Sequence, residues 1–296
     1  MPNVRLPLVI ASILVAAACS NSGGGSPGSD SGRSPSPAAS ADAEGLTHPT
    51  GAGEVVLRMA EGGGFVPAEF NATNVPVFTL YGDGRVVFQD ANVIPPPPAN
   101  GGPTIHPPLR TAVLSEEQIQ SLLNFAITEG GLAVARERYD NPMIADAPTT
   151  TFTIRAGGVE KTVAVYALGL DAEPGPDSNV KAALVKLAER LRSFDQGGAL
   201  RSDPYQPQAF RGALWEVGPG IGAPKPWPWT DLAPADFTAP AAPNGFGFPT
   251  HDLTKAQLEA LGLGTPSGAV SGLTFTGPDG KVYGFAIRPL LPDEIG

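Results

Sequence analysis

Alternating apolar and polar positions recur along the chain from about residue 54, and they predict a series of short strands. The first run of this kind covers residues 54–59. Three later pairs of β-rich runs are separated by glycine-containing turns, which is typical of β-hairpins. The predicted hairpins join residues 77–81 to 85–88, residues 151–155 to 162–166, and residues 273–276 to 281–287.

Two of the predicted helices carry a recognisable start signal. Ser115 is followed three residues later by Gln118, which is the spacing of a capping box. Thr254 and Gln257 repeat that spacing before a second, shorter apolar run. In each case an apolar residue precedes the cap, as expected when a hydrophobic contact fixes the entry of the helix.

A further helix is predicted over residues 178–192 by the spacing of its apolar side chains. Val180, Leu184, Leu187 and Leu191 fall on one face of such a helix, whereas lysines, glutamate and arginine occupy the other faces. The polar face mixes both signs of charge, so we expect a helix packed on a sheet rather than one lying on a membrane.

These elements indicate an α+β fold, with antiparallel strands and hairpins, a few covering helices and Pro/Gly-rich loops. The 37 Gly and 33 Pro among 296 residues favour turns and irregular loops. The order strand, long loop, capped helix and hairpin occurs in residues 51–196 and again in residues 197–296, which we therefore treat as two domains or halves. A duplicated unit and the chance recurrence of common elements both account for this order.

The N-terminal region has a different pattern. Residues 6–18 form an uncharged apolar run of 13 residues that follows Arg5. A membrane-spanning helix needs about 20 such residues, whereas this length suits the core of a signal peptide. We therefore expect residues 1–18 to be removed on export.

The residues Val15-Ala16-Ala17-Ala18-Cys19 follow directly, and Cys19 is the only cysteine of the chain. This segment resembles the lipobox of bacterial lipoprotein precursors, with Ala16 at the place where leucine is most common. The resemblance covers about the first 20 residues. It implies that the Cys19 thiol receives a diacylglycerol and that the chain is cut just before it. The alternative is ordinary signal cleavage after Ala18, which would leave Cys19 as a free thiol.

Residues 20–46 contain almost no large apolar side chains, so burial cannot offset the entropy of ordering them. We expect residues 19–50 to form a disordered, lipidated tether. A flexible coil of about 27 residues has an r.m.s. span of roughly 30 Å, which would lift a domain clear of a membrane surface.

The formal net charge of -10 argues against nucleic acid as a partner, because binding phosphates requires clustered lysine and arginine. The same charge argues against adsorption to anionic lipid by electrostatics alone. The lipid on Cys19 is therefore the expected link to the membrane, and an envelope protein or polysaccharide is the expected ligand.

The sequence carries no recognisable catalytic or metal motif, and no cofactor is expected. The three histidines are His48, at the end of the predicted tether, His106, in a proline-rich loop, and His251, before the last helix. They lack the spacing of a zinc site, and no Gly-x-Ser-x-Gly motif is present. A Ser/His/Asp triad assembled from distant residues stays open, since such triads are recognised by geometry, with His106 or His251 as its base.

Trp227 and Trp229 are the candidate ligand-binding residues, because they lie in a loop rich in Pro, Gly and aromatic residues. Rigid loops that present aromatic rings can bind sugars or proline-rich peptides at low entropic cost. The alternative is that these rings attach their own loop to the domain.

The sequence therefore predicts a membrane-tethered, extracytoplasmic lipoprotein with a binding or scaffold role. Two other functions stay open: a tethered cell-envelope hydrolase, and an inhibitor or accessory subunit of another envelope protein.

Overall fold

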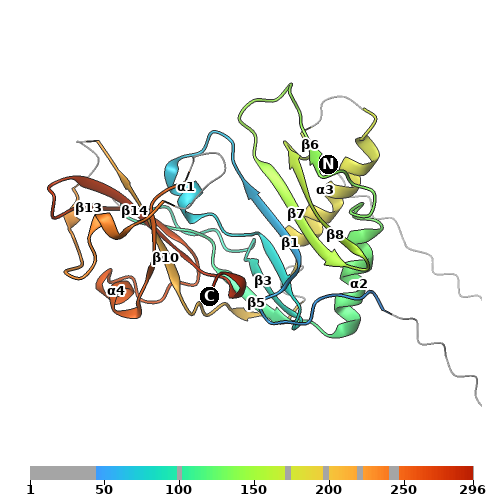
Figure 1. Ribbon diagram of the computed structural model, residues 1–296, viewed down its shortest axis with the longest axis horizontal. Coiled ribbons are helices and arrows are strands. Elements are labelled where there is room, and N and C mark those ends of the chain that lie inside the picture. The colour runs from blue at the N-terminus through green and yellow to red at the C-terminus, as the bar shows by residue number, and fades with distance from the viewer. Residues whose placement is uncertain are drawn as a thin grey trace, which may run out of the picture. The chain divides into compact units, whose positions relative to one another are not determined.

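The computed structural model describes residues 45–98, 102–170, 175–195, 200–218, 223–239 and 247–295. Within these ranges the fold is α+β, with two largely antiparallel sheets and four short helices, so the predicted fold class is confirmed (Figure 1). Cys19, the predicted signal peptide and the tether up to residue 44 lie outside the described residues.

The first sheet has the strand order β6-β8-β7-β1-β2-β3-β5-β9. All neighbouring pairs are antiparallel except β6 and β8. Its strands are β1 (Val55–Gly62), β2 (Phe78–Tyr81), β3 (Arg85–Gln89), β5 (Leu109–Val113), β6 (Arg138–Tyr139), β7 (Thr149–Ala156), β8 (Val159–Tyr166) and β9 (Asp203–Pro204).

The second sheet has the order β11-β13-β14-β10-β12, and β4 adds to it by pairing with β13. Its strands are β4 (Thr104–Ile105), β10 (Phe210–Glu216), β11 (Lys225–Pro226), β12 (Thr250–Leu253), β13 (Val270–Thr276) and β14 (Val282–Pro289). The chain therefore passes between the sheets more than once: β4 joins the second sheet, β5 returns to the first, and β10 enters the second again.

The three predicted hairpins are present as β2–β3, β7–β8 and β13–β14. Their turns contain glycines in the left-handed region, where a Cβ atom would be strained. Gly157 and Gly158 have φ values of 57° and 74°. The glycine turns between β-rich runs therefore predicted all three hairpins correctly.

The four helices are α1 (Ala68–Thr73), α2 (Glu116–Ile127), α3 (Ser178–Arg192) and α4 (Lys255–Ala260). Both predicted capping boxes are present, since Ser115 and Gln118 bond reciprocally at the start of α2, and Thr254 and Gln257 do so at the start of α4. Helix α1 was not predicted. Its six residues are too short to show a helical period.

Helices α2 and α3 cover one face of the first sheet (Figure 1). Ile119, Leu122, Leu123 and Ala126 of α2 are buried, as the sequence predicted. On α3 the buried positions are Leu184, Leu187, Ala188 and Leu191, and the predicted Val180 is only partly buried. These side chains share one core with those of β1, β2, β3, β7 and β8.

The two halves are not built to the same pattern. In the first, β1 pairs with β7, the leading strand of its hairpin. In the second, β10 pairs with β14, the trailing strand of its hairpin. The preceding strand therefore lies beside the first strand of the hairpin in one half and beside the second strand of the hairpin in the other. This difference argues against a simple duplication.

The predicted tether reaches too far into the chain. Residues 45–50 lie against α2 and the β7–β8 turn, because the Leu46 amide donates to Gln120 Oε1 at 2.6 Å and the Gly157 amide donates to the Thr47 carbonyl at 2.8 Å. These backbone contacts could not be read from a segment with so few apolar side chains.

The other face of the first sheet is covered by the C-terminal segment after β14. Asp293 accepts hydrogen bonds from Arg58 of β1 at 2.6 Å and from the Tyr81 hydroxyl of β2 at 2.7 Å. The Tyr205 hydroxyl donates to the Leu290 carbonyl at 2.9 Å, and Leu291 is buried beside Tyr81. This segment connects the second sheet to the first.

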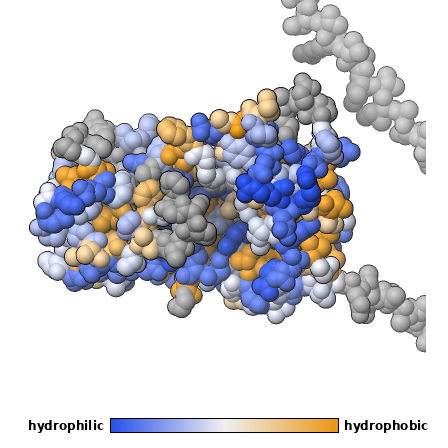
Figure 2. Space-filling view, turned by 45° about the horizontal axis from the view of Figure 1, so that its top comes forward, coloured by the Kyte–Doolittle hydropathy of each residue, from blue (hydrophilic) through white to orange (hydrophobic). Residues whose placement is uncertain are grey.

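In the described residues, no helix combines the length and the apolar character needed to cross a bilayer. Figure 2 shows a face on which hydrophilic side chains predominate and hydrophobic ones are scattered in small groups. Single exposed apolar side chains of this kind are ordinary on protein surfaces.

The contact at Asp293 predicts a pH-dependent stability. Burial disfavours the ionised carboxylate, but the hydrogen bonds from Arg58 and Tyr81 outweigh it and hold the pKa of Asp293 below its usual value. A carboxyl whose pKa is lower in the folded protein stabilises the fold above the unfolded pKa of about 3.9, and loses this effect as the pH falls through the folded pKa. We expect Asp293→Asn to lower the free energy of unfolding by about 2 kcal/mol at pH 7, and by progressively less as the pH falls from the unfolded pKa of about 3.9 through the lower folded pKa.

Urea denaturation at several pH values measures this difference. Glu216→Gln is the matched control, because the ion pair of Glu216 with Lys281 is largely exposed and should contribute less than about 1 kcal/mol. An equal loss of stability in both variants at pH 7 would contradict the role given to Asp293.

Candidate functional site

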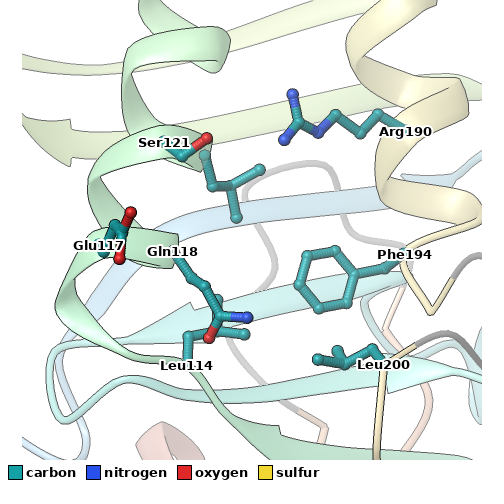
Figure 3. A pocket seen from close by; sticks show the side chains of 8 residues that line it. Leu114, Glu117, Gln118, Ser121, Arg190, Phe194 and Leu200 are labelled. Carbon is teal, nitrogen blue, oxygen red and sulfur yellow. The ribbon is translucent and has the colours of Figure 1, made fainter.

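A groove lies between α2 and α3 on the outer side of the first sheet, and we call it the α2/α3 groove (Figure 3). Its volume is about 510 Å³, which is within the range of small-molecule sites. It is lined by Leu114, Glu117, Gln118, Ser121, Leu122, Arg190, Phe194 and Leu200.

The floor of the groove is apolar and belongs to the core of the domain. Leu114 and Leu122 are 7% and 2% exposed. Phe194 follows the end of α3, and its ring contacts those of Phe78 and Phe88 with centroid distances of 4.6 and 5.5 Å. Because it packs on the sheet in this way, Phe194 provides a fixed apolar wall.

The rim of the groove is polar. Glu117, Gln118 and Ser121 lie on the exposed side of α2, three and four residues apart, as the helical period requires. The side-chain oxygen of Gln118 is already used, since it accepts from the Ser115 amide at 2.9 Å. This bond holds Gln118 at the start of the helix.

Arg190 is the only cationic residue among those that line the groove. Figure 3 shows its side chain extending from α3 toward Ser121 of α2. Its guanidinium lies 4.2 Å from the ring centroid of Phe125, a cation–π contact. Across the described ranges Arg190 has no carboxylate partner, whereas Arg192, two residues later, is paired with Glu61.

The groove therefore has the composition of a binding site. An apolar floor with a few polar groups at the rim is the usual arrangement of ligand pockets. No lining residue is a histidine or a cysteine. In the part of the chain that the structure describes, no cluster of three or more His, Cys, Asp or Glu could hold a metal ion.

His106 lies elsewhere, between α1 and β13. Its Nε2 atom is 2.9 Å from the Ser271 hydroxyl and 3.4 Å from the Thr73 hydroxyl. Burial lowers the pKa of His106 below its usual value, so the ring is neutral at pH 7. It borders a hollow of about 270 Å³ that Phe70 and Ala269 also line.

This histidine–serine pair lacks two features of a catalytic triad. Ser271 is 3% exposed and does not line the hollow. Among the described residues no carboxylate forms a hydrogen bond with His106 to orient its ring. The pair is better explained as a hydrogen bond that satisfies a buried hydroxyl where β4 joins β13.

The other two histidines are also structural. His251 lies in β12, and its ring packs against Phe237 at 5.6 Å. The side chain of His48 is only 7% exposed, with Nε2 3.3 Å from Glu116 and Nδ1 2.6 Å from the Pro49 carbonyl. The prediction that His48 belongs to a disordered tether is wrong, because these contacts hold it against the start of α2.

The structure does not present Trp227 and Trp229 as an exposed platform. Trp229 is 6% exposed, and its ring nitrogen donates to the Gln257 carbonyl at 2.8 Å. Trp227 is partly buried, packs at 5.1 Å against Trp229, and donates to the Leu232 carbonyl at 2.6 Å. Both rings pack in the core of the second sheet, so the alternative that they attach their own loop to the domain is the better account.

The groove could not be identified from the sequence. Arg190 was assigned only to the polar face of its helix, and Phe194 lies beyond the last helical turn. No periodic pattern indicates that α2 and α3 leave a space between them.

The burial of Trp229 predicts a large loss of stability on truncation. Replacing it with Ala should lower the free energy of unfolding by about 3–5 kcal/mol, because a buried ring and its hydrogen bond are removed. Phe65→Ala is the control, since that ring is 89% exposed and its loss should change stability by no more than about 0.5 kcal/mol. A small effect of Trp229→Ala in thermal or urea denaturation would mean that this ring is not part of the core.

Comparisons of the chain with protein-family models, with curated proteins and with solved structures gave no match.

Proposed function

We propose that this chain is an extracytoplasmic lipoprotein, anchored through Cys19, that binds a small and partly apolar ligand in the α2/α3 groove. The observation that carries this proposal is the groove itself: a space of about 510 Å³ with an apolar floor and a polar rim. The lipobox-like segment before Cys19 supports export and anchoring.

The position of the groove suits a tethered binding protein. The chain enters the described domain along α2, where Leu46 bonds to Gln120 and His48 to Glu116. The groove uses other residues of the same helix. The predicted tether between Cys19 and Gly45 lies outside the described residues, and a flexible coil of that length would span roughly 25–30 Å. Such a tether would keep the groove near the membrane while leaving it open to ligand.

A tethered hydrolase is the second candidate, and the contact of 2.9 Å between His106 and Ser271 is the observation that favours it. It ranks below binding because a nucleophile must reach its substrate, and Ser271 is buried. A general base also works best when a third group orients it, and no carboxylate in the described ranges bonds to His106.

Lipidation of Cys19 can be tested by metabolic labelling with palmitate in the native host. We expect label in the wild-type protein and in the control Ser20→Ala, and none in Cys19→Ser, which should also leave the membrane fraction. Label that persists in Cys19→Ser would contradict the anchor, because the chain has no other cysteine.

Binding in the groove can be tested with N-phenyl-1-naphthylamine, a neutral apolar dye whose fluorescence rises on burial. The Cys19→Ser protein should be used, so that no acyl chain of its own competes. We expect Ser121→Phe to weaken dye binding roughly tenfold, because the added ring occupies the groove and about 1.4 kcal/mol of contact is lost.

Asn124→Phe is the matched control, since Asn124 is exposed on the same helix but does not line the groove. It should leave the dye affinity unchanged. No binding by the wild-type protein, or equal binding by both variants, would show that the groove is not the binding site.

A further inference from the structure

The α2/α3 groove combines an apolar floor with one cation, Arg190, that has no carboxylate partner among the described residues, and this combination restricts the class of ligand. Each of the arginines that follow is held by a carboxylate: Arg58 by Asp293, Arg192 by Glu61, Arg211 by Asp252 and Arg288 by Glu294. Arg190 is held only by the face of the Phe125 ring. Among the described residues no ion pair of Arg190 with a carboxylate is present, although the chain has a net charge of -10.

The surroundings of Arg190 increase the strength of a contact with an anion. It is partly buried at the edge of an apolar floor formed by Leu122 and Phe194. Charge-assisted hydrogen bonds are stronger where water is partly excluded, and a guanidinium can bind a carboxylate, phosphate or sulfonate through two parallel bonds. The stacking on Phe125 leaves the edges of the guanidinium, which carry the N–H donors, available for such an anion.

The other charged lining residue limits the position of the anion. Glu117 lies on the first turn of α2, on the opposite side of the groove from Arg190. Arg190 and Glu117 do not form an ion pair in the described structure, so the carboxylate does not neutralise the guanidinium. An anionic group is therefore favoured at the α3 side, and an apolar body along Leu114, Leu122 and Leu200.

We infer that the ligand of the α2/α3 groove is a small anionic amphiphile, with a single negatively charged group bound by Arg190 and an apolar body packed on the floor. This inference rests on the proposed binding function and specifies the ligand of the same site.

Two dyes with nearly the same aromatic body separate charge from apolar contact. 1-Anilinonaphthalene-8-sulfonate carries a sulfonate, and N-phenyl-1-naphthylamine does not. In fluorescence titrations of the Cys19→Ser protein, Arg190→Gln should weaken binding of the sulfonate dye roughly tenfold and binding of the neutral dye less than about twofold.

Lys186→Gln is the matched control, because Lys186 is exposed one turn earlier on α3 and its loss changes the net charge equally. It should leave both affinities unchanged. Decanoate should displace the sulfonate dye from the Lys186→Gln control and from the Cys19→Ser protein that retains Arg190. It should do so at a lower concentration than 1-decanol.

The outcomes distinguish the two claims. If neither dye binds, or if Ser121→Phe affects neither, the groove is not a binding site and the proposed function fails. If both dyes respond to Ser121→Phe but the sulfonate dye does not respond to Arg190→Gln, the site stands and the anionic ligand class is wrong. A third outcome is that the protein co-sediments with phosphatidylglycerol vesicles, that Arg190→Gln abolishes this, and that decanoate does not displace the sulfonate dye. It would assign Arg190 to a lipid surface and overturn the inference of a small ligand.

Discussion

The carboxylate of Asp293 is the polar contact on which the assembly of the two sheets depends. Every residue of β2 is buried, so both faces of the first sheet must be covered. On one face this is done by apolar side chains of α2 and α3. On the other face the guanidinium of Arg58 would lose its carboxylate partner and the hydroxyl of Tyr81 its acceptor, at a considerable free-energy cost, if the C-terminal segment did not bring Asp293 to them. Since burial and this hydrogen bond also raise the pKa of Tyr81, the phenol stays protonated and remains a donor.

This arrangement explains why the second sheet cannot be treated as an independent module. Its last strand continues directly into the segment that carries Asp293, and Arg288 holds that segment through two bonds to Glu294, at 2.8 and 2.6 Å. On the other side β4, an early part of the chain, pairs with β13. Each sheet therefore contains one short strand from the other predicted half, β4 in the second sheet and β9 in the first.

The helical face of the first sheet is free of these connections, and the groove lies there. Its floor is rigid, because Leu122 and Phe194 are part of the same core that holds α2 and α3 on the sheet. Its rim includes exposed side chains that do not cap a helix, Glu117 and Ser121, and these can change without loss of the fold. In such a site the apolar floor contributes both to the stability of the fold and to ligand binding. Arg190, in the proposed function, contributes to ligand recognition alone.

The sequence by itself determined the features that depend on neighbours in the chain. Hairpins were predicted from glycine turns between β-rich runs, two helix starts from a cap and its partner three residues later, and the helix over residues 178–192 from its apolar period. Each of these signals acts within about four residues, so no tertiary information was needed.

Only the tertiary structure decided the contacts between distant residues. Asp293 meets Tyr81 across 212 positions, and His106 meets Ser271 across 165. Trp229 could have been exposed or buried, because a proline-rich loop has no period that assigns a side chain to one face. The groove arises where two amphipathic helices, each correctly predicted, leave a space beside Phe194. Periodicity states which face of a helix is apolar, but the partner of that face, and the space left next to it, are set by packing between elements far apart in the chain.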